Sequence, residues 1–244
     1  MKDSVSTVVS SRMITPDVFE LIVHTDLAKE AGAGQFVNIK VDHGFLRRPV
    51  SISRIGNDQL TFLIKIIGEG TKELSRRKAG DSIDLFGPLG NGFPEVNEPV
   101  ILIGGGIGIA PLIEEAKVLK NKNLEVTAVL GFNTESDVFA VEEFQELGCE
   151  VSVSTMDGSY GTAGTVIDAI KETGIENRYV IACGPLPMLK AVSANYQRGC
   201  VSLEARMACG IGACMGCVVK SPDGEALRVC KDGPVFEIGK VVIE

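Results

Sequence analysis

The residues best suited to chemistry lie near the C-terminus of this 244-residue chain, where four cysteines follow the pattern C-x4-C-x2-C-x12-C. They are Cys209, Cys214, Cys217 and Cys230. The first three fall within nine residues, on a loop that also holds three glycines. Glycine lets a backbone bend tightly and leaves its N–H groups bare, so such a loop can wrap a charged inorganic group. The pattern therefore predicts a site held by four thiolates.

The spacing of these cysteines discriminates between the groups that thiolates bind. An opening of x4 and then x2, with a distant fourth cysteine, is the plant-type arrangement of a [2Fe–2S] cluster, in which backbone N–H groups also hydrogen-bond to the sulfurs. Zinc sites with four cysteines usually consist of two short knuckles, and only one such pair is present here. The spacing favours a [2Fe–2S] cluster, with zinc and disulfide bonds as the alternatives.

Composition excludes some partners and locations. The net charge of −8 argues against non-specific nucleic-acid binding, which needs a basic face. The longest apolar stretch, residues 99–113, is interrupted by four glycines and is too short to cross a bilayer. Residues 1–16 lack the apolar core of a secretory signal. Seven cysteines, four of them clustered, fit a reducing compartment. We therefore expect a cytoplasmic protein without a membrane segment.

Two patterns of secondary structure precede the cysteines and must position them. Residues 4 to about 90 contain six short strand candidates separated by turns, which indicates an antiparallel barrel or sandwich. From residue 98 the pattern alternates between strand and helix, as in a parallel sheet with crossover helices. We expect a multidomain β and α/β fold, with a β-barrel domain at 1–96, an α/β domain at 97–199 and a cluster-binding segment at 200–244. In that segment, 218–221 and 227–230 are predicted to pair as a hairpin.

Two motifs of the first domain could bind a phosphate-bearing ligand. Arg48-Pro49-Val50-Ser51 begins a strand, and its guanidinium can bind phosphate through two parallel hydrogen bonds. Further on, the strand Ile64-Lys65-Ile66 leads through Gly68 and Gly70 to Thr71, the predicted N-cap of a short helix whose free N–H groups suit a pyrophosphate. Taken alone, the first motif is more simply an exposed arginine beside an edge-strand proline, and the second an ordinary capped helix.

The second domain carries a glycine-rich loop between its first strand and its first helix. Residues 104–111 read Gly-Gly-Gly-Ile-Gly-Ile-Ala-Pro, a departure from G-x-G-x-x-G because Ile109 stands where the third glycine would be. The strand–loop–helix context still favours nucleotide binding over a plain tight turn. Cys183-Gly184-Pro185 follows a later strand, at the edge where parallel sheets bind ligands. The alternative for Cys183 is a buried strand-end cysteine, the interpretation that we accept for Cys149 and Cys200.

Taken together and in this order, these motifs resemble the ferredoxin–NADP reductase superfamily over residues 4 to about 195. The resemblance implies FAD in the first domain and a nicotinamide nucleotide in the second. The implied flavin-binding residues are Arg48, Pro49, Val50, Ser51, Ile64, Lys65, Ile66, Gly70 and Thr71. The implied nucleotide-binding residues are Gly105, Gly106, Gly108, Cys183, Gly184 and Pro185, with Cys183 as a catalytic residue beside the nicotinamide.

The identity of the nucleotide is predicted from the loop at 131–137. This loop has no Arg or Lys to bind a 2′-phosphate, and its two carboxylates, Glu135 and Asp137, would repel one. We therefore expect NADH rather than NADPH.

The combination of cofactors indicates an electron relay. NADH gives up two electrons as hydride, a [2Fe–2S] cluster accepts one at a time, and a flavin can do both, so FAD is the required converter. A chain that ends in a one-electron carrier, without an evident acid–base site for a carbon acid, should pass electrons to another protein.

Only about 45 residues, 200–244, remain for the cluster, fewer than a full ferredoxin module has. Their stretch LEARMACGIGACMGCVVK closely resembles the electron-transfer subunits of two-subunit, NAD-linked dihydroorotate dehydrogenases. That resemblance covers the whole chain and implies a partner, the catalytic subunit that holds FMN and interconverts dihydroorotate and orotate in pyrimidine synthesis, in a heterotetramer of two plus two. Two alternatives remain, a reductase subunit of a hydrogenase, sulfide- or ferredoxin-linked complex, and a zinc-stabilised nucleotide-binding module without catalysis.

Overall fold

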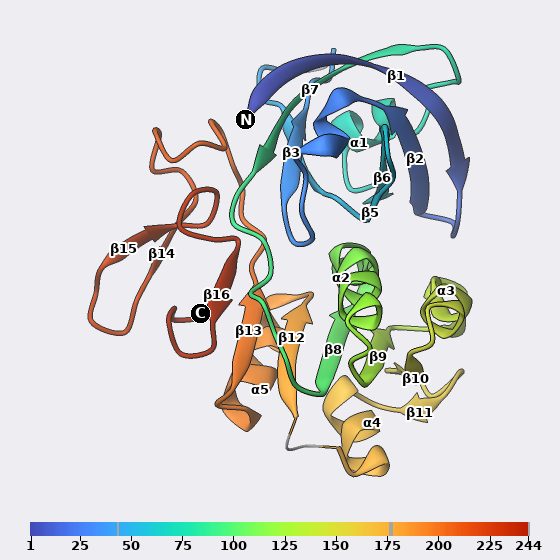
Figure 1. Ribbon diagram of the computed structural model, residues 1–244, viewed down its shortest axis with the longest axis vertical. Helices are drawn as coiled ribbons and strands as arrows, with labels where there is room; N and C mark the ends of the chain where they lie inside the picture. The colour runs from blue at the N-terminus through green and yellow to red at the C-terminus, as the bar shows by residue number, and fades with distance from the viewer. Residues whose placement is uncertain (43, 176–177, 244) are drawn as a thin grey trace.

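The computed structural model describes residues 1–42, 44–175 and 178–243. Figure 1 shows an antiparallel sheet above, a parallel sheet with its helices below, and the C-terminal segment beside both. Within the described ranges, no helix is long and apolar enough to cross a membrane.

The first sheet is antiparallel and strongly curled (Figure 1). Its order is β4-β3-β7-β1-β2-β6-β5. Its interior is filled by large apolar side chains such as Phe19, Leu21 and Phe62, which alternate with outward-facing residues as the period of two requires. The strands are β1 (Lys2–Met13), β2 (Val18–His24), β3 (Phe36–Ile39), β4 (Arg48–Ser51), β5 (Arg54–Ile55), β6 (Gln59–Lys65) and β7 (Ser82–Leu89), with the short helix α1 (Glu69–Leu74) after β6.

The predicted barrel is observed as a half-barrel. Its two edge strands, β4 and β5, are consecutive in the sequence. Residues 48–55 form two separate strands, β4, which pairs with β3, and β5, which pairs with β6. Between them, the Ile52 N–H donates to the Gln35 carbonyl (3.0 Å) and the Ser53 N–H to that of Thr61 (2.9 Å). The chain therefore crosses from one edge of the sheet to the other within two residues, and β4 and β5 form no ladder with each other.

The second sheet is parallel, as predicted, apart from its last strand. Its order is β11-β10-β9-β8-β12-β13-β16. The chain runs outward from the central β8 to β9 and β10, and then crosses to β12 and β13 on the other side. This reversal beside β8 is a topological switch point, where open α/β sheets bind ligands. The strands are β8 (Val100–Gly105), β9 (Val126–Phe132), β10 (Glu150–Thr155), β11 (Thr162–Ala163), β12 (Tyr179–Cys183), β13 (Gly199–Ser202) and β16 (Val235–Glu237).

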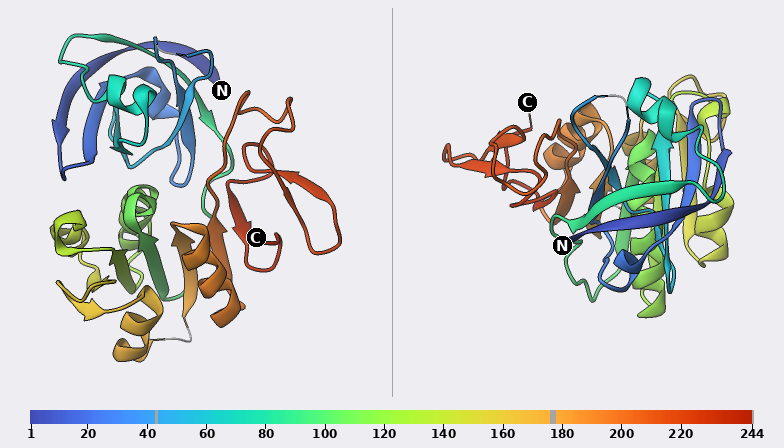
Figure 2. Two further views of the ribbon diagram at one scale, coloured as in Figure 1. Left: turned by 180° about the vertical axis from the view of Figure 1, so that it is seen from behind. Right: turned by 90° about the horizontal axis from the view of Figure 1, so that it is seen from above.

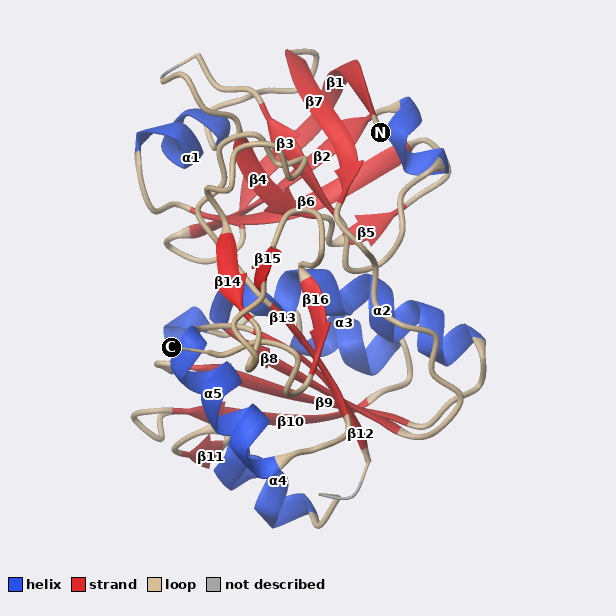
Figure 3. Ribbon diagram, turned by 90° about the vertical axis from the view of Figure 1, so that its left-hand side faces the viewer, coloured by secondary structure: helices blue, strands red, loops and turns tan. Residues whose placement is uncertain are grey.

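Helices cover both faces of the parallel sheet (Figure 3). Along β8, Val100 and Leu102 pack with residues of α2 and α3, whereas Ile101 and Ile103 pack with residues of α4 and α5. This alternation explains why β8 is apolar at every position, since both of its faces are buried. The helices are α2 (Ala110–Asn121), α3 (Val141–Glu146), α4 (Val166–Thr173) and α5 (Leu186–Asn195).

The C-terminal segment is tied into the rest of the molecule rather than appended to it. Its predicted hairpin is confirmed as β14 (Val218–Lys220) and β15 (Ala226–Arg228). The chain then returns as β16 and pairs antiparallel with β13 (Figures 1 and 2). The side chain of Asn91, in the connection between the two sheets, bonds both the N–H (3.1 Å) and the carbonyl (3.0 Å) of Val235. The division expected between residues 199 and 200 therefore falls inside β13.

Candidate nucleotide and cluster sites

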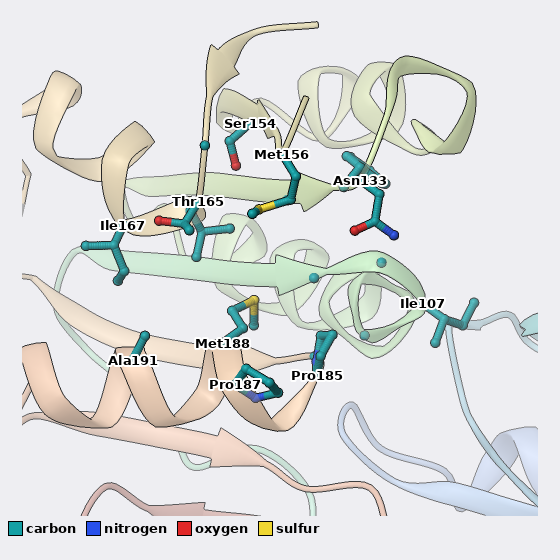
Figure 4. Close-up of a pocket in the computed structure, with 18 of the residues that line it drawn as sticks. Ile107, Asn133, Ser154, Met156, Thr165, Ile167, Pro185, Pro187, Met188 and Ala191 are labelled. Atoms are coloured by element: carbon teal, nitrogen blue, oxygen red, sulfur yellow. The ribbon is translucent and has the colours of Figure 1, made fainter. Parts of the chain in front are cut away.

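A cavity of about 570 Å³ opens at the carboxyl ends of the parallel strands, at the switch point (Figure 4). The predicted Gly105, Gly106 and Gly108 line it together with Gly184 and Pro185. Figure 4 shows Ser154, Met156 and Thr165 on one side of the central strand and Pro185 and Met188 on the other. The volume is in the range of small-molecule and cofactor sites.

The two nucleotide motifs of the second domain lie directly against each other. A Cβ added to Gly108 would be 2.5 Å from the Cys183 carbonyl oxygen and 2.5 Å from the Gly184 Cα. A Cβ at Gly105 would be 2.6 Å from the Met188 sulfur. Only glycine permits this approach, so the loop after β8 and the turn after β12 together form the wall of the cavity. Gly106, with a φ of +51° and no neighbour of its Cβ position within 4 Å, is open toward the cavity.

Cys183 does not present its thiol to the cavity. It closes β12 with 2 % exposure and packs in the sheet's core. Burial raises the pKa of this thiol well above its ordinary value, and the nearby charge of Glu204 raises it further, against a hydrogen bond with Ser202. The main chain of Cys183 and Gly184 therefore shapes the site, whereas a catalytic role for the thiol stays a prediction.

Several cavity residues were not predicted. Asn133 follows β9, Ser154 is near the end of β10 and Met156 follows that strand, whereas Thr165 is the N-cap of α4 (Figure 4). The positions of the first three at strand ends could have identified them. The Ser154 hydroxyl is buried and has no hydrogen-bond partner among the described residues, as expected of a group that a ligand satisfies. Glu204 also lines the cavity, although it belongs to the segment expected to serve the cluster.

The loop after β9 is acidic and internally fixed. Asp137 accepts hydrogen bonds from the Thr134 N–H and hydroxyl, both at 3.3 Å. The Glu135 N–H donates to the Ser159 hydroxyl (2.8 Å), which itself donates to Asp157 (2.6 Å). The hydrogen bonds from Ser159 hold the pKa of Asp157 below its ordinary value. The carboxylates of Asp137 and Asp157 and the backbone of Glu135 are thus fixed at the end of the sheet where Met156 and Asn133 line the cavity.

The two motifs of the half-barrel are also brought together. The Arg48 guanidinium lies over Gly70, where an added Cβ would be 2.8 Å from the Arg48 Cζ. Val50 and Ile64 turn their side chains into the core, so that only their backbone could meet a ligand. A cation stacked on the first turn of α1 fits an anionic group such as a pyrophosphate.

The predicted N-cap at Thr71 is wrong. Helix α1 begins three residues earlier, with Gly68 as its N-cap. The Thr71 hydroxyl instead accepts hydrogen bonds from the N–H groups of Ile67 (3.0 Å) and Gly68 (3.3 Å). Thr71 stabilises the helix start from inside the first turn, as the third residue of a capping box does.

The cysteine loop directs backbone N–H groups at its sulfurs. Positive φ angles at Gly210 (+72°), Gly212 (+81°) and Met215 (+59°) turn the chain. The Gly212 N–H donates to the Cys230 sulfur (3.1 Å), and those of Ile211 (3.4 Å) and Ala213 (3.3 Å) to the Cys209 sulfur. Such bonds stabilise thiolates, the form that binds iron or zinc.

The thiols differ in their acidity. Burial opposes ionisation of Cys209, but hydrogen bonds from the Ile211 N–H and from Cys214 outweigh it and lower its pKa to about 6. Burial raises the pKa of Cys230 to about 12, and the adjacent Cys217 contributes to the rise.

Side-chain hydrogen bonds join Cys209 with Cys214 and Cys217 with Cys230, and the charge of Cys209 also acts on Cys230. Within the part of the chain that the structure describes, no three or more His, Cys, Asp or Glu side chains surround one point closely enough to hold a single metal ion. Two pairs fit a group with two irons, each taking two thiolates, better than one tetrahedral zinc. All seven cysteines are free thiols, so the disulfide alternative is wrong.

Comparison with known proteins agrees with both sites. Residues 204–242 match the family model of the iron–sulfur cluster binding domain of dihydroorotate dehydrogenase B, and residues 102–194 match the oxidoreductase NAD-binding domain. The dihydroorotate dehydrogenase B (NAD(+)) electron transfer subunit of Geobacillus sp. (strain WCH70) is 44 % identical over 100 % of both chains. The chain belongs to this family. The subunits of Bacillus mycoides (strain KBAB4) and Shouchella clausii (strain KSM-K16) are 44 % and 41 % identical, each over 97 % of both chains.

Solved structures place the electron transfer subunit among the ferredoxin reductases, as the motifs predicted. The NADH-dependent reduced ferredoxin–NADP oxidoreductase has a TM-score of 0.89 and 34 % identity over 98 % of this chain and 90 % of that one. The ferredoxin NADP+ reductase of Neisseria gonorrhoeae has a TM-score of 0.68 over 80 % of this chain and 90 % of that one, and at 18 % identity it shows the shared fold alone.

Proposed function

We propose that this subunit takes electrons from NADH and delivers them singly to the FMN of a dihydroorotate dehydrogenase catalytic subunit, which interconverts dihydroorotate and orotate. The observation that carries the proposal is the joint packing of the three sites. One buried apolar cluster contains Phe36 and Leu89 of the half-barrel, Val201 of the parallel sheet, and Cys217 and Cys230 of the cysteine set. A nucleotide cavity, a phosphate-binding motif and a thiolate loop are thus fixed on one framework.

The residues present suit three cofactors. FAD would be held by Arg48 to Ser51, by Ile64, Lys65 and Ile66, and by Gly70 and Thr71. NAD(H) would occupy the cavity between the loop at 105–108 and the turn at 183–185, and a [2Fe–2S] cluster would be held by Cys209, Cys214, Cys217 and Cys230. When bound, FAD supplies the exchange between two-electron hydride chemistry and the one-electron chemistry of the cluster.

The protein's own groups have defined parts in this arrangement. The Arg48 guanidinium neutralises phosphate charge beside Gly70, whose missing side chain leaves room for it. The wall formed by Gly106, Gly108 and Gly184 lets a dinucleotide approach the main chain. Glu135, Asp137 and Asp157 disfavour a 2′-phosphate, which supports NADH as the substrate.

The organisation of the assembly is also proposed. The FAD unit corresponds to 1–96, the NAD unit to 97–199 and the cluster unit to 200–244, with β13 shared across the last boundary. The exposed Cys214 is flanked by the exposed apolar residues Ile211, Met215 and Val218, which suits a face that meets a partner. We propose a cytoplasmic heterotetramer of two such subunits and two catalytic subunits.

Co-purification with a dihydroorotate dehydrogenase catalytic subunit, followed by NADH-dependent reduction of orotate, tests the function. Cys214→Ser should keep NADH-dependent reduction of a dye but abolish reduction of orotate by the complex. Cys149→Ser, which alters a buried cysteine outside the loop, is the matched control and should retain both activities. Loss of both activities in Cys214→Ser with FAD retained, or full orotate reduction by this subunit alone, would contradict the relay.

A second function is favoured by the likeness to the NADH-dependent reduced ferredoxin–NADP oxidoreductase over 98 % of this chain. In that case the subunit would serve a ferredoxin-linked complex. The same preparation, given reduced ferredoxin, NADH and NADP+ in place of orotate, distinguishes the two. Orotate reduction without ferredoxin-dependent NADP+ reduction supports the first function, and the reverse supports the second.

A further inference from the structure

Arg228, in the hairpin strand β15, is tied to the cysteine loop by hydrogen bonds. Its Nη1 donates to the Gly212 carbonyl oxygen at 3.0 Å. Its Nε donates to the Asp232 carboxylate at 3.1 Å, and its main-chain N–H donates to the same carboxylate at 2.7 Å. The side chain is half-buried, so the guanidinium is held in one place beside the loop.

The carbonyl that Arg228 contacts belongs to the peptide group that joins Gly212 to Ala213. The N–H of this same peptide group, that of Ala213, donates to the Cys209 sulfur at 3.3 Å. Hydrogen bonds in a chain polarise one another, so a cation on the carbonyl oxygen makes the N–H a stronger donor. Arg228 therefore acts on the Cys209 sulfur through one peptide group.

Arg228 also lies close to the two buried cysteines. It stands two residues before Cys230, and it pairs with Val218, the residue that follows Cys217. The hydrogen bond with Asp232 raises the pKa of the guanidinium, and the negative charges of Cys230 and Cys217 contribute to the rise. The same positive charge thus reaches the buried cysteines directly as well as Cys209 through the peptide group.

A cation in this place has a defined effect on an iron–sulfur cluster. A [2Fe–2S] cluster held by thiolates is negatively charged, and reduction adds a further negative charge. A fixed cation and hydrogen bonds to the sulfurs therefore stabilise the reduced state more than the oxidised one. We propose that Arg228 is a positioning residue that holds the cysteine loop and makes the reduction potential of the cluster less negative. This inference rests on the cluster of the proposed function.

Asp232 allows a charge effect to be separated from a structural one. Its carboxylate holds the Arg228 guanidinium and carries the opposite charge. If Arg228 acts through its charge, removal of the cation and removal of the anion should shift the cluster potential in opposite directions. If the pair only supports the loop, both removals should disturb the cluster in the same direction.

The test is a redox titration of the subunit loaded with FAD and iron, followed by visible absorbance and by the electron paramagnetic resonance of the reduced cluster. Arg228→Gln should lower the equilibrium constant for reduction of the cluster about 10-fold, the size expected for one partly screened charge, which corresponds to about 59 mV for a one-electron couple. Asp232→Asn should raise that constant. Arg228→Lys keeps the charge but loses the planar fork, and should fall between Arg228→Gln and wild type.

Lys171→Gln is the matched control, because it removes an exposed positive charge far from the cluster. Lys171 lies on α4, which packs on β9, β10 and β11, at the opposite edge of the parallel sheet from β16. Solvent screens a charge at that distance, so the equilibrium constant should stay within about two-fold of wild type.

Two results would overturn the proposal. An unchanged cluster potential in Arg228→Gln, with full iron content, refutes it directly. Shifts in the same direction in Arg228→Gln and Asp232→Asn would show that the pair supports the loop without setting the potential. If Arg228→Gln fails to retain iron, Asp232→Asn decides, and an unchanged potential in that variant refutes the proposal. Absence of a [2Fe–2S] signal from the iron-loaded wild-type protein would instead refute the proposed relay, and the inference with it.

Discussion

Gly108 offers a direct test of the contact that builds the nucleotide cavity. In Gly108→Ala, the new methyl group would lie 2.5 Å from both the Cys183 carbonyl oxygen and the Gly184 Cα. Both neighbours are backbone atoms of the turn that closes β12, so neither can rotate away. The loop at 105–108 must therefore move off the turn at 183–185, and the wall that they form together must open.

The loss of stability in Gly108→Ala can be sized from the cost of overpacking at a rigid contact. Inserting a methyl group into such a place costs about 1–3 kcal/mol. For a chain of this size each kcal/mol lowers the melting temperature by about 2–4 °C, which predicts a fall of about 2–12 °C. NAD+ affinity should fall as well, because the displaced wall is the surface that a pyrophosphate would approach.

Thermal unfolding and NAD+ titration of the loaded protein measure the two effects. Gly56→Ala is the matched control, since Gly56 lies in the turn between β5 and β6, does not line the cavity, and has no atom closer than 3.5 Å to its Cβ position. That variant should melt close to wild type and bind NAD+ normally. If Gly108→Ala matched the control in both measurements, the loop and the turn would not form the rigid contact described above.

Two further predictions concern the cluster loop and helix α2. Gly210 has a φ of +72°, and in Gly210→Ala the new methyl group would be directed at the Asn38 side chain. The iron content and visible absorbance of this variant should therefore fall while FAD is retained. Gly224→Ala is the control, because Gly224 has a φ of +87° but open space around its Cβ position, and this variant should keep its iron. Burial raises the pKa of Glu115 to about 7 against an ordinary 4.5, and the carboxyl therefore destabilises the fold once it is charged. The free energy of unfolding should lose about 3 kcal/mol between pH 4.5 and pH 7 through this group, so Glu115→Gln should exceed wild type in urea unfolding at pH 8 and lose that advantage at pH 5. An equal difference at both pH values would contradict the assignment.

The parallel sheet and the C-terminal hairpin could be predicted because short stretches of sequence encode them. The alternation of strand and helix from residue 98 specified the parallel sheet, because each strand, loop and helix carries its own signal. The hairpin at 218–228 was predicted for the same reason. The cysteine spacing predicted a shared site, and the structure adds the N–H groups that face the sulfurs.

Features that depend on distant pairing were not predictable in this way. Strands β13 and β16 have four and three residues and meet across more than 30 positions of sequence, so neither shows a period of its own. Without that pairing, nothing in the sequence placed Glu204 in the nucleotide cavity. The direction of the Cys183 thiol likewise depends on the register of β12 between β8 and β13, which fixes which face each residue takes.

The burial of the cluster ligands determines how a partner can approach. Cys217 and Cys230 belong to the apolar cluster shared with Phe36 of the half-barrel and Val201 of the sheet. Cys214 is exposed and Cys209 is half-buried. Cys217 and Cys230 therefore face the remainder of this chain, and among the four cysteines Cys214 is the one most accessible to another protein. Because a packed core rather than a flexible linker holds the loop, a substitution that loosens this core should impair delivery to the partner even where all four cysteines are intact.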